Sequence, residues 1–415
     1  MTGNKKAVLI AGSRTPIGTF GRSLRSVTVD KLAEHAIRHA MRRAGIEPGR
    51  VDGVILGHAY QSPFTPNTAR FTWVNAGWPV NVPGYTIQIQ CGSGMKAVNE
   101  AMDQIALGHG DLYVAGGAES MSTIPYMVPG ERRWSDFLNR FSFLAKKFKF
   151  GPRPFIGLAE DGLVPRSLLW DIKSTHMAAT AERVATVYGI SREEMDAYAL
   201  RSQEQAARAI ADGLFDVEID PIQTSRGFLS KDEHPRSTSL AKLAALGGTN
   251  RTKNITAGNA SGINDGACAL VVASAEYAEQ IGATPLAVLV DHCEAGVKPE
   301  EMGLGPVAAI TKLLERNNLT LNDIDLFELN EAFAAQYLGC EKLLGLDRDK
   351  VNVNGGAIAL GHPIAVSGAR VILTLAHELR RRGLKRGIAS LCIGGGMGIA
   401  TLIEIPDDNQ ADSTR

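Results

Sequence analysis

The stretch with the clearest chemical potential is Cys91-Gly92-Ser93-Gly94, which follows a β-prone run ending at Gln90 and precedes a helix-compatible run. We expect the cysteine sulfur to lie at the N-terminus of that helix. Free N–H groups and the helix dipole favour a thiolate there, which predicts a lowered pKa for Cys91. The glycines let backbone N–H groups approach an atom bonded to the sulfur. An inert packing residue is the alternative, because most buried cysteines only fill space.

Three further glycine-flanked segments carry polar or reactive side chains at predicted strand or loop ends: Asn330-Glu331-Ala332-Phe333, Gly361-His362-Pro363 and Cys392-Ile393-Gly394. Sites in open α/β sheets gather beyond the carboxyl ends of the strands, so we expect these segments to meet Cys91. Taken alone, the histidine also fits a capped loop residue, and the second cysteine also fits a packing residue at a strand end.

The composition is that of an ordinary globular chain. Its 415 residues suffice for two or three domains, 44% are hydrophobic and 21% are charged. The formal net charge of zero argues against a nucleic-acid-binding surface over the whole molecule. No apolar run reaches membrane-spanning length, and the N-terminus lacks a secretory pattern. Five cysteines without metal-ligand spacing indicate reduced thiols, a cytoplasmic location and no metal site.

Strands and helices alternate along the first part of the chain. Strands are expected at Ala7–Ala11, Val51–Gly57 and Asp111–Ser120, with helices at Val29–Ala44 and from about Met95 to Leu107. This alternation predicts an α/β fold with a mostly parallel sheet.

Two similar halves enclose a large insertion. The repeated pairs, at nearly constant spacing, are Val51-Asp52 with Ile324-Asp325, Ser93-Gly94 with Ser367-Gly368, and Val114-Ala115 with Ile388-Ala389. The repeat predicts a duplication, with chance identity as the alternative. We expect an N-terminal half over residues 1–123 with 262–282, an inserted loop domain over 124–261, a C-terminal half over 283–405 and a frayed tail over 406–415.

With these segments in order, the sequence resembles the thiolase family over nearly its whole length. The matching motifs are Arg14-Thr15-Pro16-Ile17-Gly18, Cys91-Gly92-Ser93-Gly94, Gly116 to Ser122, Thr256 to Gly266, Asn330-Glu331-Ala332-Phe333, Asn352 to Pro363 and Cys392 to Gly396. The resemblance implies a duplicated α/β fold. Two similar βα halves with mixed sheets sandwich helices in five αβαβα layers, and a large loop domain is inserted in the first half.

The resemblance also implies roles for five residues. Cys91 resembles the nucleophile that accepts the acyl group, which divides one difficult carbon–carbon step into two easier ones. His362 resembles the base that maintains the thiolate and activates coenzyme A, and Cys392 resembles the acid/base that moves the α-proton. Asn330 resembles the holder of a water that forms one oxyanion hole with the histidine. The N–H groups of Cys91 and Gly394 would form the other.

Substrate contacts and partners follow from the same resemblance. His176, Met177 and Met302 match positions that line the acyl and pantetheine channel, and Ser261 matches a hydroxyl that contacts the pantetheine amide. Core packing remains the alternative for the methionines, and a turn for the serine. The family implies that coenzyme A and acyl-CoA are substrates, with no permanently bound cofactor. The inserted domain would cover the site and bind coenzyme A. A homodimer or homotetramer is expected, with an accessory subunit left open.

The sequence departs from the usual family pattern in three places. Ala365 and Val366 add bulk next to the histidine, which is expected to reshape the acyl pocket or shift the start of the next helix. Leu246 to Asn250 replaces an expected aromatic residue, which puts the packing of adenine and pantetheine in doubt. Phe141 to Lys173 is longer than in simple members, and its lysines fit either a phosphate contact or a solvated surface.

Several other functions compete with this interpretation. A thiolase specialised for a bulky, branched or aromatic substrate remains open because of Ala365 and Val366. A non-catalytic acyl-CoA-binding or lipid-binding relative is expected to lose Cys91, His362 or Cys392, and all three are present. A decarboxylating ketosynthase needs a histidine or an asparagine in place of Cys392.

Overall fold

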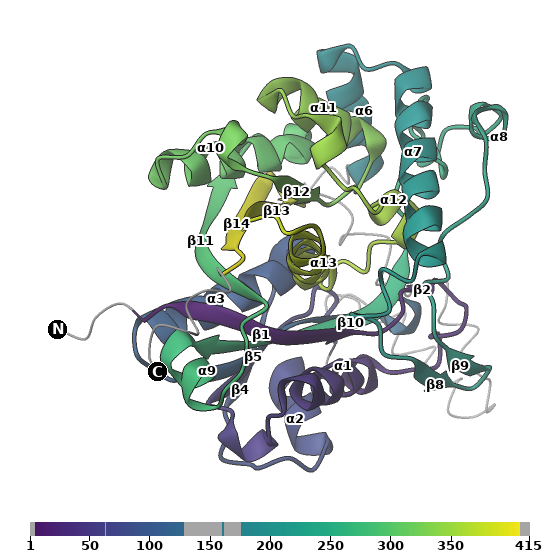
Figure 1. Cartoon of the computed structure of the whole chain (residues 1–415). Coiled ribbons are helices and arrows are strands. Elements are labelled where there is room, and N and C mark those ends of the chain that lie inside the picture. The colour runs from purple at the N-terminus through teal and green to yellow at the C-terminus, as the bar shows by residue number, and fades with distance from the viewer. Residues whose placement is uncertain (1–4, 63, 128–159, 162–175, 407–415) are drawn as a thin grey trace, which may run out of the picture.

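The computed structural model describes residues 5–62, 64–127, 160–161 and 176–406 (Figure 1). Most of its strands share one continuous sheet of ten strands, in the order β12-β13-β14-β11-β1-β10-β5-β3-β4, with β2 paired to β10. The two halves of this sheet meet where β1 pairs with β11 through only three residue pairs, Ala7–Leu9 with Ala287–Leu289.

The elements of the first half are β1 (Ala7–Arg14), β2 (Gly18–Thr19), α1 (Val29–Ala44), β3 (Gly53–Gly57), α2 (Thr68–Asn75), β4 (Gly84–Ile87), α3 (Ser93–Ala106), β5 (Leu112–Ser120), β10 (Asn264–Ser274) and α9 (Ala275–Gln280). Those between β5 and β10 are β6 (Tyr126–Met127), β7 (Glu160–Asp161), α6 (Met177–Tyr188), α7 (Arg192–Ala211), β8 (Ile222–Thr224), β9 (Gly227–Leu229) and α8 (Leu240–Ala244). The second half comprises β11 (Ala287–Gly296), α10 (Gly305–Arg316), β12 (Leu326–Leu329), α11 (Ala334–Leu344), α12 (Ala357–Leu360), α13 (Ser367–Arg382), β13 (Arg386–Ile393) and β14 (Met397–Glu404).

The layers confirm the predicted fold. α3 and α13 pack against each other in the centre, with β11 to β14 on one side and β1, β3, β5 and β10 on the other (Figure 1). α10 covers the outer face of the first group of strands, and α1 covers the outer face of the second. The two inner helices therefore lie buried between two sheet halves, which places both of their N-termini in the interior.

The halves repeat one topology, as the offset pattern predicted. The order β3-β5-β10-β1 in one half corresponds to β12-β13-β14-β11 in the other. β3 pairs with β5 in parallel, as β12 does with β13, and the other pairs within these two sets of four strands are antiparallel. The first half has one more strand, β4, which pairs with β3 in parallel.

The prediction of a mostly parallel sheet was wrong, and the sheet is mixed. β14 follows β13 directly as an antiparallel hairpin, with no helix between them. Gly395 and Gly396, with φ of 93° and 90°, form the turn, a conformation that other residues adopt only at a cost. β10 likewise returns antiparallel to both of its neighbours.

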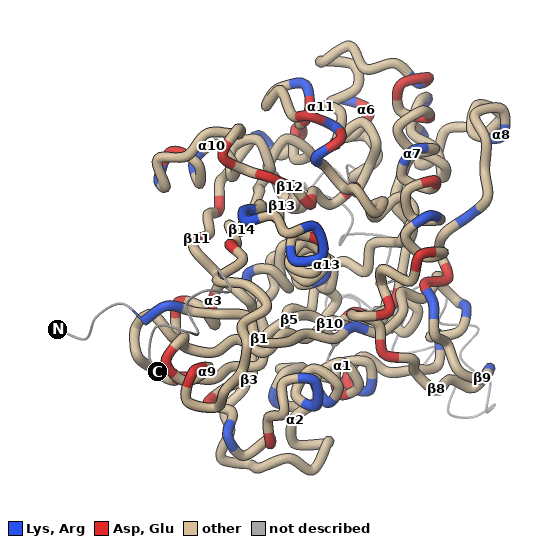
Figure 2. The backbone as a smooth tube through the Cα atoms, viewed as in Figure 1, with Lys and Arg blue, Asp and Glu red and all other residues tan. Residues whose placement is uncertain are grey.

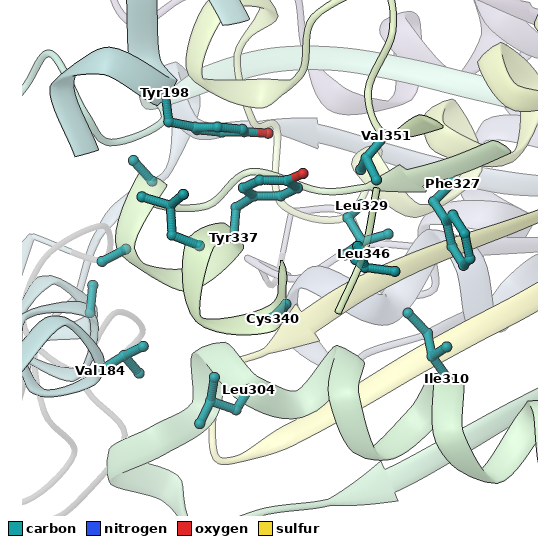
Figure 3. Close-up of a cluster of buried hydrophobic side chains, with 14 of the residues drawn as sticks. Val184, Tyr198, Leu304, Ile310, Phe327, Leu329, Tyr337, Cys340, Leu346 and Val351 are labelled. Carbon is teal, nitrogen blue, oxygen red and sulfur yellow. The ribbon is translucent and has the colours of Figure 1, made fainter. Parts of the chain in front are cut away.

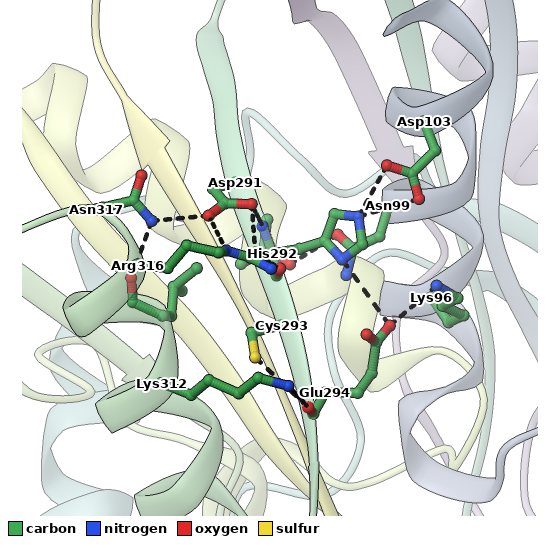
Figure 4. Close-up of polar contacts among 12 residues, drawn as sticks. Lys96, Asn99, Asp103, Asp291, His292, Cys293, Glu294, Lys312, Arg316 and Asn317 are labelled. Carbon is green, nitrogen blue, oxygen red and sulfur yellow. Dashed lines mark hydrogen bonds and ion pairs between the residues drawn. The ribbon is translucent and has the colours of Figure 1, made fainter. Parts of the chain in front are cut away.

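Polar contacts tie the helix that follows Cys91 to the second half. Asp103 of α3 bonds His292 of β11 at 3.1 Å, and Lys96 pairs with Glu294 at 3.0 Å (Figure 4). These pairs are partly exposed, so each is worth about 1 kcal/mol or less. Their main consequence is to fix the register of α3 against β11.

Charges of both signs are interspersed along the described chain, and most of the central strand residues are uncharged (Figure 2). Within the described residues, no helix combines the length and apolar character that crossing a bilayer needs. The lysines of Phe141 to Lys173 lie outside the described residues, so their predicted contacts stay predictions.

Candidate active site

One cavity of about 400 Å³ collects most of the predicted site residues. Its volume is in the range typical of small-molecule sites. The predicted residues that line it are Cys91, His176, Met177, Ser261, Met302, His362, Cys392 and Gly394. The first and last of these in sequence come from opposite halves of the fold, so the site exists only because the duplicated halves face each other.

Cys91 lies in a short 3-10 turn, Gln90–Gly92, directly before α3, as the strand-to-helix prediction required. The Ser93 hydroxyl fixes this elbow, because it donates to the Gln90 carbonyl at 2.7 Å and accepts from the Ile89 N–H at 2.9 Å. Gln90 itself adopts a left-handed conformation with φ of 52°. The sulfur is thereby held at the cavity wall by local hydrogen bonds.

The predicted fall in the pKa of Cys91 was wrong in direction. Burial between the two halves raises the pKa of this thiol to about 11, and the negative charge of Glu119 adds to the rise. The backbone N–H groups of Gly394 and of Cys91 itself act in the opposite direction, as a helix N-terminus was expected to do. Loss of water outweighs them, so the resting sulfur is a neutral thiol at pH 7.

His362 is buried, with its backbone N–H bonded to the Asn264 side chain at 2.9 Å. Its Nδ1 lies 2.6 Å from the Ser367 hydroxyl, which donates to the Pro363 carbonyl at 3.1 Å. Because that hydroxyl proton is engaged, we assign the imidazole proton to Nδ1, and the lone pair is left on Nε2. The unprotonated Nε2 is therefore the nitrogen that can act as a base.

The resting imidazole is neutral. Burial lowers the pKa of His362 to about 3, and the positive charge of Arg370 contributes to the fall. The cysteine and histidine thus rest as a neutral thiol and a neutral imidazole, which differs from a preformed thiolate–imidazolium pair.

Cys392 is the penultimate residue of β13 and lies in a small apolar cluster. Met302 and Ala332 are its buried neighbours, with Met177 and Phe333 packed against them. This burial raises the pKa of the Cys392 thiol well above its usual value, and the nearby Cys91 adds to the rise. Cys91 is therefore close enough to influence Cys392 electrostatically.

Asn330 lies behind the cavity wall and is fully buried. Its Nδ2 is 3.5 Å from Nε2 of His362, and its Oδ1 accepts no hydrogen bond from the described part of the chain. The adjacent Glu331 fixes this loop, since its carboxylate accepts bonds of 2.7 Å from the hydroxyls of Tyr198 and Ser202 on α7. The amide thus faces the base from a rigid segment.

The packing around this segment is dense. Tyr198 of α7 stacks on Tyr337 of α11, with ring centroids 4.0 Å apart (Figure 3). Cys340 and Leu304 belong to the same buried cluster. The cluster therefore packs α7, which lies between β5 and β10 in the sequence, against α11 of the second half.

The remaining predicted contacts lie along the same cavity. His176 caps α6, because its Nδ1 accepts the Ala178 N–H at 3.1 Å, and Met177 follows it. Ser261 is held by a bond from its N–H to the Ala332 carbonyl at 3.0 Å. These positions agree with a channel, although the fold does not assign a contact to any one of them.

Several cavity residues escaped the sequence prediction. His234 and Arg236 reach the cavity from the loop after β9, and Thr249 and Asn250 reach it from the segment that lacks the expected aromatic residue. The Arg236 guanidinium donates to the Ala257 carbonyl at 3.0 Å. No spacing relates these residues to Cys91, so only the run Asp232 to Arg236, with its charges and histidine, could have drawn attention.

Ala365 and Val366 do not line the cavity, and α13 begins immediately after them at Ser367. Val366 packs in the core between the halves, and Ala365 packs in a small cluster against which Cys91 lies. The residue directly before them, Ile364, does line the cavity.

Comparison with known proteins identifies the family. The profile of the thiolase N-terminal domain matches residues 7–276, and that of the thiolase C-terminal domain matches residues 283–405. The chain belongs to the thiolase family. An acetyl-CoA acetyltransferase of Chromobacterium violaceum is 43% identical over 410 residues, which cover 97% of this chain and all of that relative. One of Syntrophomonas wolfei is 44% identical and covers 96% of this chain and 99% of that relative.

Solved thiolase structures share the fold. The acetyl-CoA acetyltransferase of Bacillus anthracis has a TM-score of 0.90 and 46% identity, covering 98% of this chain and all of its own. Human mitochondrial 3-ketoacyl-CoA thiolase in complex with CoA has a TM-score of 0.88 and 38% identity, covering 97% of this chain and 98% of its own. This thiolase is accordingly an acyltransferase, and the family uses coenzyme A as substrate.

Proposed function

We propose that this thiolase exchanges an acyl group between Cys91 and coenzyme A. It would cleave a 3-oxoacyl-CoA to acyl-CoA plus acetyl-CoA, or run the reverse Claisen condensation. The observation that carries the proposal is that Cys91, His362 and Cys392, far apart in sequence, line one cavity. A thiol nucleophile, a base and a second thiol are the groups that such chemistry requires.

The first half-reaction forms the acyl-enzyme. Nε2 of His362 takes the proton as the Cys91 sulfur attacks the 3-oxo carbon, since the neutral resting pair makes prior ionisation unfavourable. The oxyanion accepts hydrogen bonds from the N–H groups of Cys91 and Gly394, the two backbone groups that oppose the rise in the pKa of the resting thiol. The bond between C2 and C3 then breaks, and its electron pair forms the enolate of acetyl-CoA.

The second thiol completes this step. Cys392 donates its proton to C2 of the enolate, whose oxygen is stabilised by Nε2–H of the protonated His362 and by a water held on Asn330. Acetyl-CoA leaves, and coenzyme A enters. The proton on His362 passes to the Cys392 thiolate. Nε2 of His362 then takes the proton of the coenzyme A thiol as its sulfur attacks the acyl-Cys91 carbon, and returns that proton to the departing Cys91 sulfur. Acyl-CoA is released, and all three groups regain their resting protonation states. The same groups serve the reverse direction.

We also propose that residues 124–261 form a loop domain over the substrate, between the halves 1–123 with 262–282 and 283–405. Its support is that His234, Arg236, Asn250 and Ser261 all line the cavity. A cytoplasmic homo-oligomer without a permanently bound cofactor remains a prediction from the sequence.

The test is thiolysis of acetoacetyl-, long-chain and aryl-branched 3-oxoacyl-CoA by the purified protein in the presence of coenzyme A. We expect thioester cleavage with release of acetyl-CoA for at least one of them. Binding of acyl-CoA without any cleavage would favour the non-catalytic relative. Cleavage of the branched substrate alone would favour the specialised enzyme.

A further inference from the structure

Glu119 is a fully buried carboxylate on β5, one residue before the strand ends at Ser120. It has no role in the chemistry described above. Each of its oxygens receives two contacts. Oε1 accepts the Tyr60 N–H at 3.2 Å and lies 3.3 Å from Nε2 of His58. Oε2 accepts the N–H groups of Ala59 at 3.1 Å and Ala365 at 3.2 Å.

These contacts bring three segments to one point. His58 to Tyr60 follow β3, Glu119 belongs to β5, and Ala365 lies three residues after His362 in the loop that leads to α13. The Ala365 peptide is also wedged between two glycines. A Cβ at Gly94 would lie 2.3 Å from the Ala365 carbonyl oxygen, and one at Gly117 would lie 1.9 Å from it.

Cys91 packs on the cluster that this carboxylate secures. Ala59, Tyr60 and Ala365 are members of the cluster, and Cys91 lies against it. A negative charge is thus buried between the segment that carries the base and the residue that carries the nucleophile.

We propose that Glu119 is a positioning residue for the reaction, which clamps the histidine loop to the sheet and presents its negative charge to the Cys91 sulfur. The inference rests on the proposed function, in which those two groups react. The clamp sets the approach of imidazole to thiol. The charge holds the sulfur in the protonated form until the base removes the proton, consistent with the direction in which Glu119 moves the pKa of Cys91.

Other titratable groups surround Glu119 and the cavity. His58 lies against Glu119 from the loop after β3, and Asp265 of β10 is close enough for the two carboxylates to influence each other. Besides Cys91, the titratable or charged residues that line the cavity are His176, His234, Arg236, His362 and Cys392. His58 must carry a proton on Nε2 to face a carboxylate. Its Nδ1 lies 2.7 Å from the Thr68 hydroxyl, which also lies within 3.3 Å of the Thr65 carbonyl.

Two substitutions distinguish the effect of the hydrogen bond to Ala365 from the effect of the negative charge on Cys91. Glu119→Gln removes the charge, and its remaining oxygen can still accept the Ala365 N–H. Glu119→Asp keeps the charge, and its shorter side chain withdraws from Ala365. Thermal unfolding and circular dichroism of both variants establish that each is folded before the other measurements are compared.

We expect Glu119→Gln to shift the pH dependence of Cys91 alkylation by iodoacetamide to lower pH, by up to about one unit. We expect Glu119→Asp to leave that profile in place and to lower kcat on the order of tenfold or more, with little change in KM for coenzyme A. Asp196→Asn is the control, because Asp196 is a buried carboxylate on α7 that bonds Arg192 at 2.8 Å; neither readout should change.

An unshifted or upward-shifted profile in Glu119→Gln would overturn the inference, as would wild-type kcat in Glu119→Asp. The alkylation profile needs no turnover. Failure of the wild-type protein to form an acyl-enzyme would therefore reject the proposed function, whereas an unchanged profile in a protein that does form it would reject only the role of Glu119.

Discussion

The resting protonation of Cys91 gives a prediction that can be worked out quantitatively. Burial raises the pKa of this thiol to about 11, and burial lowers the pKa of His362 to about 3. At pH 7 only about one molecule in ten thousand carries the thiolate, and that fraction rises about tenfold with each pH unit up to about pH 10. A preformed ion pair would instead give a constant thiolate fraction above neutral pH.

The assay is the rate of iodoacetamide labelling of Cys91 between pH 6 and 10, followed by mass spectrometry of the peptide that contains it. Peptide resolution is needed because Cys392 lines the same cavity. We expect a continuous rise without a plateau. His362→Asn should leave the slope unchanged, since a neutral imidazole stabilises no thiolate. A plateau that begins near neutral pH and disappears in His362→Asn would refute this reasoning.

Two further predictions concern the proton-transfer groups. Cys392→Ser should still form the acyl-enzyme at Cys91 from a simple acyl-CoA but should lose carbon–carbon cleavage and formation, because a hydroxyl is far less acidic than a thiol; wild-type-like condensation by this variant would contradict its role. Ser367→Ala removes the acceptor for Nδ1 of His362, and we expect kcat to fall by about one to two orders of magnitude with KM for coenzyme A unchanged. Ser390→Ala is the matched control, since that buried hydroxyl bonds only the backbone among the described contacts, and equal losses in both variants would point to a general packing effect.

The elements that local patterns determine were predicted well from the sequence. The helix expected at Val29–Ala44 is present with those bounds and ends at Gly45, whose φ of 66° explains the stop. α7 begins with a capping box between Ser191 and Glu194, which is also a local signal. The glycines around Cys91 likewise located the elbow.

Features that depend on the assembled fold were not predictable in this way. The predicted strand direction was wrong at the β13–β14 hairpin. A pattern of alternating strands and helices does not reveal two consecutive strands that are joined directly by a turn. The pKa of Cys91 is raised, whereas the helix-dipole argument predicted a lowered value. The reason is that the second half of the fold excludes water from a thiol that belongs to the first half. Ser367 lies five residues from His362, but its bond to the imidazole requires the turn at Pro363.

The most direct test of the account is the mass of the protein after brief incubation with a 3-oxoacyl-CoA or a simple acyl-CoA, quenched in acid and mapped by peptide. We predict one added acyl group on Cys91, removed by coenzyme A and absent in Cys91→Ser. An acyl group found on another residue, or thiolysis at an undiminished rate by Cys91→Ser, would contradict the proposal that Cys91 is the nucleophile.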